Sequence, residues 1–185
     1  EWDNDQSPVS QQSDAFARAR AAVAESDTAA ALQLYVVAAQ DSSVAPFAWN
    51  NLALLWKNRG EAQRAVTLLE RAVHAYPTYA RGFYNLGLVL EEAGEEDKAL
   101  AAYDRALSLR SSHARSWAHR AEILRRRGRL EEALRSYEQA VRYQPGSRSH
   151  RFGLGLTLRE AGLYGQAAEA FGDALRLGRG EDEAT

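Results

Sequence analysis

The sequence predicts an all-α fold built from five stacked helix-turn-helix repeats. Two alanine series carry this prediction, because each recurs every 34 residues. The first series is Ala31, Ala65, Ala99, Ala133 and Ala167, and the second is Ala38, Ala72, Ala106, Ala140 and Ala174. A fixed period between about 20 and 50 residues is typical of stacked repeats. The two alanines of each repeat are seven residues apart, so they share one helix face, where small side chains let a neighbouring helix approach closely.

The alanines divide the chain into five repeats. These are residues 12–45, 46–79, 80–113, 114–147 and 148–181, with a polar lead-in at 1–11 and a tail at 182–185. Other residue types recur in the same register: a bulky residue at Trp49, Phe83 and Trp117, glycine at Gly60, Gly94, Gly128 and Gly162, and a large apolar residue at Tyr35, Leu69, Tyr103, Tyr137 and Phe171.

The third repeat shows why each repeat is expected to hold two helices. In 80–93, apolar and small residues recur at the i, i+3, i+4, i+7 spacing of one helical stripe, and 96–109 repeats the pattern. Gly94 suits the end of the first helix, since glycine adopts the left-handed conformation at little cost. Glu95, Glu96 and Asp97 suit the start of the second, where the helix dipole favours acidic side chains. Neither helix can bury its stripe alone, so neighbours must stack.

The pattern resembles the tetratricopeptide repeat (TPR), whose units read W-x2-L-G-x2-Y, then A-x3-F, then P, at a period of about 34 residues. Leu52 and Leu86 follow Trp49 and Phe83 by three residues, with small Ala53 and Gly87 next, and Pro77 and Pro145 close two repeats. The resemblance covers nearly the whole chain. It implies a right-handed superhelical solenoid of five helix-turn-helix repeats that acts in protein–protein recognition.

The two end repeats depart from this pattern. The first has Ala15 at the bulky position and Ser26 in place of glycine, and the last has Arg151 at the bulky position beside Phe152. Atypical end repeats are expected as caps. The last helix, predicted at about 164–177, is followed only by a short polar segment. We therefore expect the surface bearing Ala170, Phe171 and Ala174 to be covered by a second copy or by further chain.

Composition narrows the range of functions that the sequence allows. The net charge of −2 gives no general attraction to nucleic acid or acidic membranes, although the fourth repeat holds eight Arg and four Glu, a net +4. Without cysteine, disulfides, zinc–cysteine sites and thiol catalysis are excluded, and either redox compartment is compatible, so localisation stays open. Without methionine, we expect the chain to be part of a longer translation product. No apolar run approaches the ~20 residues of a membrane helix.

No motif points to chemistry, so we expect a protein that is not an enzyme, with no catalytic residues, cofactor or metal. The four histidines, His74, His113, His119 and His150, form no i, i+4 pair or zinc motif. Carboxylate pairs such as Glu91–Glu92 and Glu131–Glu132 are explained as solvated helix ends. The sequence has no phosphate-binding loop, nucleophile elbow or dinucleotide-binding pattern.

The TPR resemblance implies which residues line a concave groove, because the first helices of the repeats face it. The implied peptide-binding residues are Asn50 and Asn51 of the second repeat, Arg81, Tyr84 and Asn85 of the third, Arg115, His119 and Arg126 of the fourth, and Phe152 of the fifth. An amide at Asn85 suits a peptide backbone, and Arg115 suits acidic groups. We expect substitution of either residue to leave thermal stability nearly unchanged, because neither occupies a packing position.

The sequence therefore predicts a scaffold or adaptor that holds a protein or peptide partner, with acidic side chains, in its groove. The alternatives are a non-catalytic binding region of a larger enzyme, and RNA binding through the turn Arg125-Arg126-Arg127-Gly128-Arg129. Nucleic acid is the less favoured partner, because Glu131 and Glu132 stand close enough to balance that turn. We expect no membrane insertion by this segment, and we keep self-association or chain continuation through the last helix open.

Overall fold

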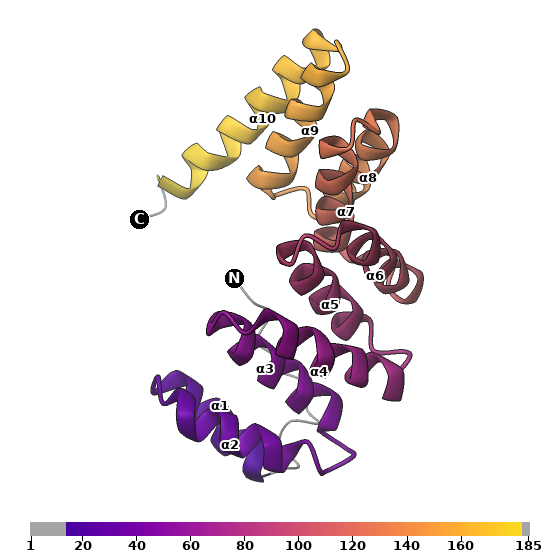
Figure 1. Ribbon diagram of the computed structural model, residues 1–185. Helices are drawn as coiled ribbons and strands as arrows, with labels where there is room; N and C mark the ends of the chain where they lie inside the picture. The colour runs from indigo at the N-terminus through magenta and orange to yellow at the C-terminus, as the bar shows by residue number, and fades with distance from the viewer. Residues whose placement is uncertain (1–13, 183–185) are drawn as a thin grey trace. The chain divides into compact units, whose positions relative to one another are not determined.

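The protein is all-helical over residues 14–182, the part that the computed structural model describes; side chains are described up to residue 178. The predicted lead-in and residues 183–185 of the tail lie outside this part. The helices drawn in Figure 1 are α1 (Asp14–Ala24), α2 (Thr28–Ala38), α3 (Ala45–Asn58), α4 (Ala62–Ala75), α5 (Ala80–Glu92), α6 (Glu96–Leu109), α7 (Ala114–Arg126), α8 (Leu130–Tyr143), α9 (Arg148–Glu160) and α10 (Tyr164–Asp182). The prediction of an all-α repeat fold is confirmed.

The chain forms two compact units, residues 1–99 and 100–185, with the boundary inside α6. In the N-terminal unit, α1 packs on α2 and α3 on α4, while α2 stacks on α3 and α4 on α5. In the C-terminal unit, α7 packs on α8 and α9 on α10, and α8 stacks on α9. First helices also touch, α3 with α5 and α7 with α9. The first, second, fourth and fifth repeats are thus helix pairs, and the second helices α2, α4 and α8 each support the next first helix.

The turn inside each repeat has one recurring geometry. Gly60, Gly94, Gly128 and Gly162 have φ between 72° and 80°, the left-handed region that glycine enters without steric cost. In the third repeat, the Glu95 N–H donates to the Leu90 carbonyl at 2.9 Å, closing the first helix. The first repeat keeps the same geometry with a non-glycine residue, since Ser26 has φ 62°. The departure at Ser26 therefore changes the residue and leaves the turn intact.

The alanine series occupy the helix contacts that the period predicts. All ten alanines are at most 3% exposed, and Ala31, Ala65, Ala72, Ala99, Ala133 and Ala140 have no exposed surface. Gly153 shows how close the contacts are, because a Cβ built on it would stand 2.5 Å from the Tyr137 ring. Small residues in these positions set the distance between helices.

The first repeat fills its missing bulky position one residue later. Phe16, which follows Ala15, has no exposed surface and lies edge-on to Tyr35, with ring centroids 5.6 Å apart. This pair anchors an apolar cluster that also takes in Leu52 of α3. The first repeat is therefore a packed helix pair despite its atypical sequence.

The structure corrects the expectation for the last helix. α10 runs to Asp182 and packs along α9, which Figure 1 shows beside it. Ala170 and Ala174 are buried, and the Phe171 ring lies against Gly155 and Phe152. This surface needs no outside cover, because α9 supplies the apolar contacts that the sequence appeared to lack. What α10 exposes is a different face.

A buried alanine has a matched, exposed counterpart on α6. We expect Ala106→Leu to lower the free energy of unfolding by about 1–3 kcal/mol, because the extra atoms overfill a close helix contact. Ala101→Leu, on the exposed face of the same helix, should change it by less than about 0.5 kcal/mol. Urea denaturation followed by circular dichroism measures both. Equal midpoints for the two variants would contradict the assigned register.

Candidate functional site

The asparagines expected to line the groove form one buried hydrogen-bonded network in the N-terminal unit. Asn85 Nδ2 on α5 donates to Asn50 Oδ1 on α3 at 2.6 Å, and Asn50 Nδ2 donates to Asn51 Oδ1 at 3.4 Å. Asn51 Nδ2 donates to the Tyr35 hydroxyl of α2 at 3.2 Å. Asn50 is 0% exposed, Asn51 6% and Asn85 4%. The network therefore joins the first three repeats, and Asn50 presents no surface to a partner.

Burial of this network has an electrostatic consequence at Tyr35. Desolvation raises the pKa of the Tyr35 hydroxyl, against the opposing effects of the hydrogen bond from Asn51 and the charge of Arg20. The hydroxyl is thus held neutral and remains an acceptor for the Asn51 amide. These contacts revise the expectation for Asn85, because its amide satisfies a buried acceptor and so contributes to stability.

The other predicted residues of this unit lie on α5. Tyr84 is 6% exposed, and Arg81, in the first turn of the helix, is half-buried. Tyr84 therefore presents little surface to a partner, and Arg81 presents part of its surface.

In the C-terminal unit, Arg115 and His119 lie one turn apart on α7, both half-buried. The His119 ring stacks on buried Tyr103, with centroids 5.6 Å apart and an interplanar angle of 21°. His150 of α9 lies near Arg115 and His119, because the charges of both residues act on it. The structure therefore gathers Arg115, His119 and His150 where α7 meets α9.

Sequence reasoning did not assign His150 to this cluster. His150 is 7% exposed, and its Nδ1 atom has no hydrogen-bond partner within the described residues. Burial lowers the pKa of His150, with the positive neighbours His119 and Arg115 acting in the same direction and a backbone hydrogen bond to Ala140 opposing them. The sequence signal that could have found His150 is its position in the repeat. The equivalent position holds the small residues Ala48, Gly82 and Ser116 in the preceding repeats.

Phe152 is the predicted groove residue with the largest exposed apolar surface. It is 52% exposed on α9, and its ring lies 5.4 Å from that of Phe171. An open pocket of about 570 Å³ borders it. The pocket is lined by Gln144, Gly146, Ser147, Arg148, Ser149 and Phe152. The Phe171 ring therefore supports the Phe152 side chain, and the pocket leaves space beside it.

The arginine-rich turn is largely neutralised. Arg125 donates from Nε and Nη2 to both Glu122 oxygens, at 3.0 and 2.6 Å, and from Nη1 to Glu160 of α9 at 2.5 Å. Arg129 is likewise bidentate on Glu132, at 2.7 and 2.8 Å. Two of the four arginines thus form ion pairs with glutamate, which weakens the case for phosphate binding at the turn. Arg126 is exposed at the end of α7.

Glu122 also connects this turn to the core. The Tyr137 hydroxyl donates to Glu122 Oε2 at 2.9 Å. Burial raises the pKa of Glu122, but the hydrogen bonds from Arg125 and Tyr137 outweigh it and hold the pKa below its ordinary value. Burial and the adjacent carboxylate raise the pKa of Tyr137. Glu122 therefore holds α7 to α8.

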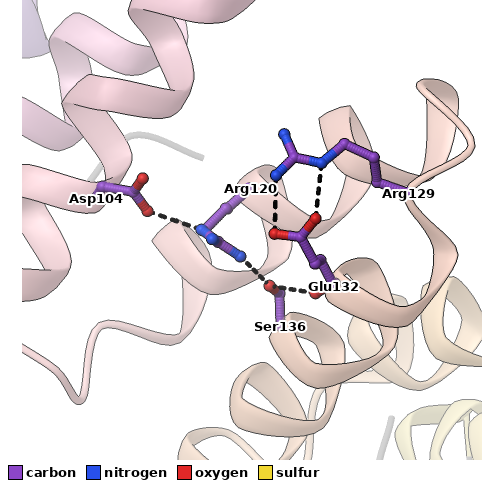
Figure 2. A network of polar contacts seen from close by, with 5 residues as sticks. All are labelled: Asp104, Arg120, Arg129, Glu132 and Ser136. Atoms are coloured by element: carbon purple, nitrogen blue, oxygen red, sulfur yellow. Dashed lines mark hydrogen bonds and ion pairs between the residues drawn. The ribbon is translucent and has the colours of Figure 1, made fainter.

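Figure 2 shows a second polar network, one that the sequence did not predict. Arg120 stands where Leu52, Leu86 and Leu154 stand in other repeats, and its guanidinium bridges two helices. Its Nε donates to Asp104 of α6 at 2.7 Å and its Nη1 donates to buried Ser136 of α8 at 2.6 Å. The network replaces an apolar contact with hydrogen bonds.

With this geometry established, the known proteins similar to the chain can be considered. The sequence profile described as "Tetratricopeptide repeat" matches residues 16–80, 57–114, 84–134 and 119–182, which together cover most of the chain. The chain belongs to the tetratricopeptide-repeat family. TPR proteins are protein–protein interaction scaffolds and are typically non-catalytic.

Solved TPR structures share this fold at low sequence identity. A crystal structure of MamA is 21% identical, with a TM-score of 0.80, 89% of this chain covered and 96% of that one. MamA 41-end from Desulfovibrio magneticus RS-1 is 19% identical, with a TM-score of 0.79 and coverage of 96% and 99%. YrrB, described as a TPR protein with an unusual peptide-binding site, is 22% identical, with a TM-score of 0.71 and coverage of 94% and 87%. No curated protein sequence matches the chain.

Among the described residues, no three His, Cys, Asp or Glu side chains gather in a way that would hold a metal ion. None of the described helices combines the length and apolar character that crossing a bilayer requires.

The asparagine network predicts a stability effect. We expect Asn85→Ala to lower the free energy of unfolding by about 1–3 kcal/mol, because Asn50 Oδ1 loses its donor in a buried site. Asn58→Ala, at an exposed position on α3, is the matched control and should change it by less than about 0.5 kcal/mol. Urea unfolding of both variants tests this. A wild-type midpoint for Asn85→Ala would show that the network adds no stability.

Burial of His150 predicts a pH effect with a definite sign. The unfolded chain takes up a proton near pH 6.5, whereas the folded chain, with its lowered pKa, does so only at lower pH. The contribution of His150 to stability is therefore intact above pH 6.5 and is lost as the pH falls below it. We expect His150→Asn, which keeps a donor for Ala140, to lose less stability than wild type between pH 8 and pH 5, measured by urea unfolding. Equal losses of stability in wild type and His150→Asn would contradict the assignment of this pH effect to His150.

Proposed function

We propose that this TPR protein holds an acidic peptide segment of a partner protein on the first helices of its C-terminal unit. The observation that carries the proposal is Phe152, an aromatic side chain 52% exposed on α9 and supported underneath by Phe171. Large exposed aromatic side chains with a packed base are typical anchors for a partner's apolar residue. The pocket of about 570 Å³ beside Phe152 gives such a residue space.

The charge of the first helices in this unit favours an acidic ligand. α7 holds four arginines and one glutamate, a net +3, and α9 holds three arginines and one glutamate, a net +2. Several of these arginines are used internally, Arg120 on Asp104, Arg125 on Glu122 and Arg151 on Asp173. Arg115 and Arg126 also lie on α7, and guanidinium groups bind carboxylates strongly and with bidentate geometry.

The predicted groove residues then have two roles. Phe152, Arg115, His119 and Arg126 are proposed to contact the ligand. In the N-terminal unit, Arg81 and Tyr84 are proposed to offer the exposed parts of their side chains, while Asn50, Asn51 and Asn85 fix the spacing of the first helices beneath them. YrrB, a TPR protein with an unusual peptide-binding site, supports peptide binding as a use of this fold.

The proposal predicts which substitutions weaken binding. A suitable probe is an array of short peptides with one Phe or Leu flanked by Asp and Glu, set beside the same peptides with Asn and Gln in place of the acids. We expect Phe152→Ala to weaken binding of both sets and Arg115→Ala to weaken only the acidic set, each about 5- to 100-fold, with less salt dependence for Arg115→Ala.

Matched controls come from the second helix α8. Tyr143→Ala removes an exposed aromatic ring and Arg142→Ala removes an exposed arginine, both on the second helix of the repeat. Wild-type affinity for these two variants, measured by fluorescence polarisation, would support the assignment. Equal weakening by the controls, or no selective binding of the acidic set, would place the partner surface elsewhere.

A further inference from the structure

The buried imidazole of His150 leaves one of its ring nitrogens without a partner. His150 is 7% exposed near the start of α9, and its ring bonds to the backbone of Ala140 on α8. Nδ1 is buried with no hydrogen-bond partner among the described residues, so the bond to Ala140 uses Nε2. A neutral ring that donates from Nε2 takes its second proton at Nδ1. Protonation of His150 therefore adds a charge at a buried atom to which no described residue offers an acceptor.

The charged groups that act on His150 are both basic. They are Arg115 and His119 of α7, the first helix that touches α9. Stacking on Tyr103 holds the His119 ring in place. From α8 the contact is the Ala140 backbone, and no described group of α10 acts on the imidazole. Burial and these two like charges together lower the pKa of His150.

Carboxylates on the neighbouring helices are engaged elsewhere. Glu122 of α7 accepts hydrogen bonds from Arg125 and Tyr137. Asp173 of α10 pairs with Arg151. No described carboxylate of α7, α8, α9 or α10 acts on His150. A negative charge that balances the imidazolium therefore has to come from a ligand.

We propose that an acidic side chain of the bound peptide, held by Arg115 and His119, favours protonation of His150, so that the protein binds acidic peptides more tightly as the pH falls. This inference rests on the peptide site proposed above and adds its regulation. The ligand carboxylate offsets the positive charge of Arg115 and His119 at His150, and a nearby negative charge stabilises a protonated imidazole. Binding and proton uptake are linked, so each strengthens the other.

The direction of the effect follows from the two states of the site. Without ligand, His150 takes up its proton only below pH 6.5, the ordinary value for histidine, because its pKa is lowered. With the carboxylate bound, proton uptake moves to higher pH. Affinity therefore rises as the pH falls through this interval, and it levels off once both states are protonated. The Asp and Glu side chains of the ligand stay ionised there, because their pKa values are about 4.

Fluorescence polarisation with the two peptide sets at pH 7.5, 6.5 and 5.5 measures the effect. We expect affinity for the acidic peptides to rise about 3- to 10-fold over this range, and affinity for the Asn and Gln peptides to change less than about 2-fold. His150→Asn, which keeps a donor for Ala140, should lose most of the rise, with circular dichroism confirming that it is folded. His74→Asn, at an exposed position on α4, is the matched control and should retain the rise.

A histidine titration by NMR tests the same coupling without a peptide. Glutarate is the probe, because it carries carboxylates and no peptide backbone, and sodium chloride at equal ionic strength is the reference. The ring signals of His150 are identified by their absence from the spectrum of His150→Asn. We expect saturating glutarate to move the titration midpoint of His150 to higher pH in wild type and in Arg142→Ala, but not in Arg115→Ala.

Two outcomes would overturn the proposal. The first is a titration midpoint of His150 that glutarate leaves unchanged, whether or not the peptides bind. The second is an affinity for the acidic peptides that does not change with pH, or a rise that His150→Asn retains in full. Failure of the proposed peptide site gives a different result, because the acidic peptides then bind at no pH while glutarate still moves the midpoint. That result would support the coupling of His150 to a carboxylate and would exclude the peptide as its source.

Discussion

Close contact between helices through small side chains is the constraint on which the rest of the structure depends. The alanines that recur every 34 residues are almost completely buried, and at Gly153 and Gly155 aromatic rings lie directly on the helix backbone. A larger side chain in these columns forces neighbouring helices apart. Because the contacts are close, first helices of consecutive repeats touch. Side chains from α3 and α5, or from α7 and α9, therefore lie next to each other.

Polar side chains in the packing columns add specific links to this framework. The Asn85–Asn50–Asn51–Tyr35 chain crosses three repeats, and Arg120 ties α6 to α8 where other repeats pack leucine. A buried polar group costs stability unless its partners are present, so each network fixes one arrangement of its helices. The buried asparagines therefore fix how the first helices of the N-terminal unit lie against each other.

The function proposed for this protein depends on the side chains that helix packing leaves exposed. Phe152 is exposed and α7 carries a net charge of +3 in the C-terminal unit, while Glu122, Glu132 and Glu160 pair with Arg125 and Arg129 of the arginine-rich turn. A helical repeat scaffold offers long helix surfaces to its partners. A TPR scaffold for protein partners agrees with both features, and the ligand chemistry proposed at Phe152 rests on its exposure and on the charge around it.

The sequence by itself determined the all-α repeat fold, the positions of the helix pairs, the glycine turns and the buried alanines, because these depend on local periodicity that is repeated five times. It also predicted that Glu131 and Glu132 balance the arginine-rich turn, and Glu132 does pair with Arg129 there. Tertiary structure alone decided which polar residues face each other: that Asn50 and Asn85 bond together, that His150 lies beside Arg115 and His119, and that α9 covers Ala170 and Phe171. Side chains on different helices meet only after the helices stack. A 34-residue period shows which positions are equivalent, but it does not show which side chains contact each other.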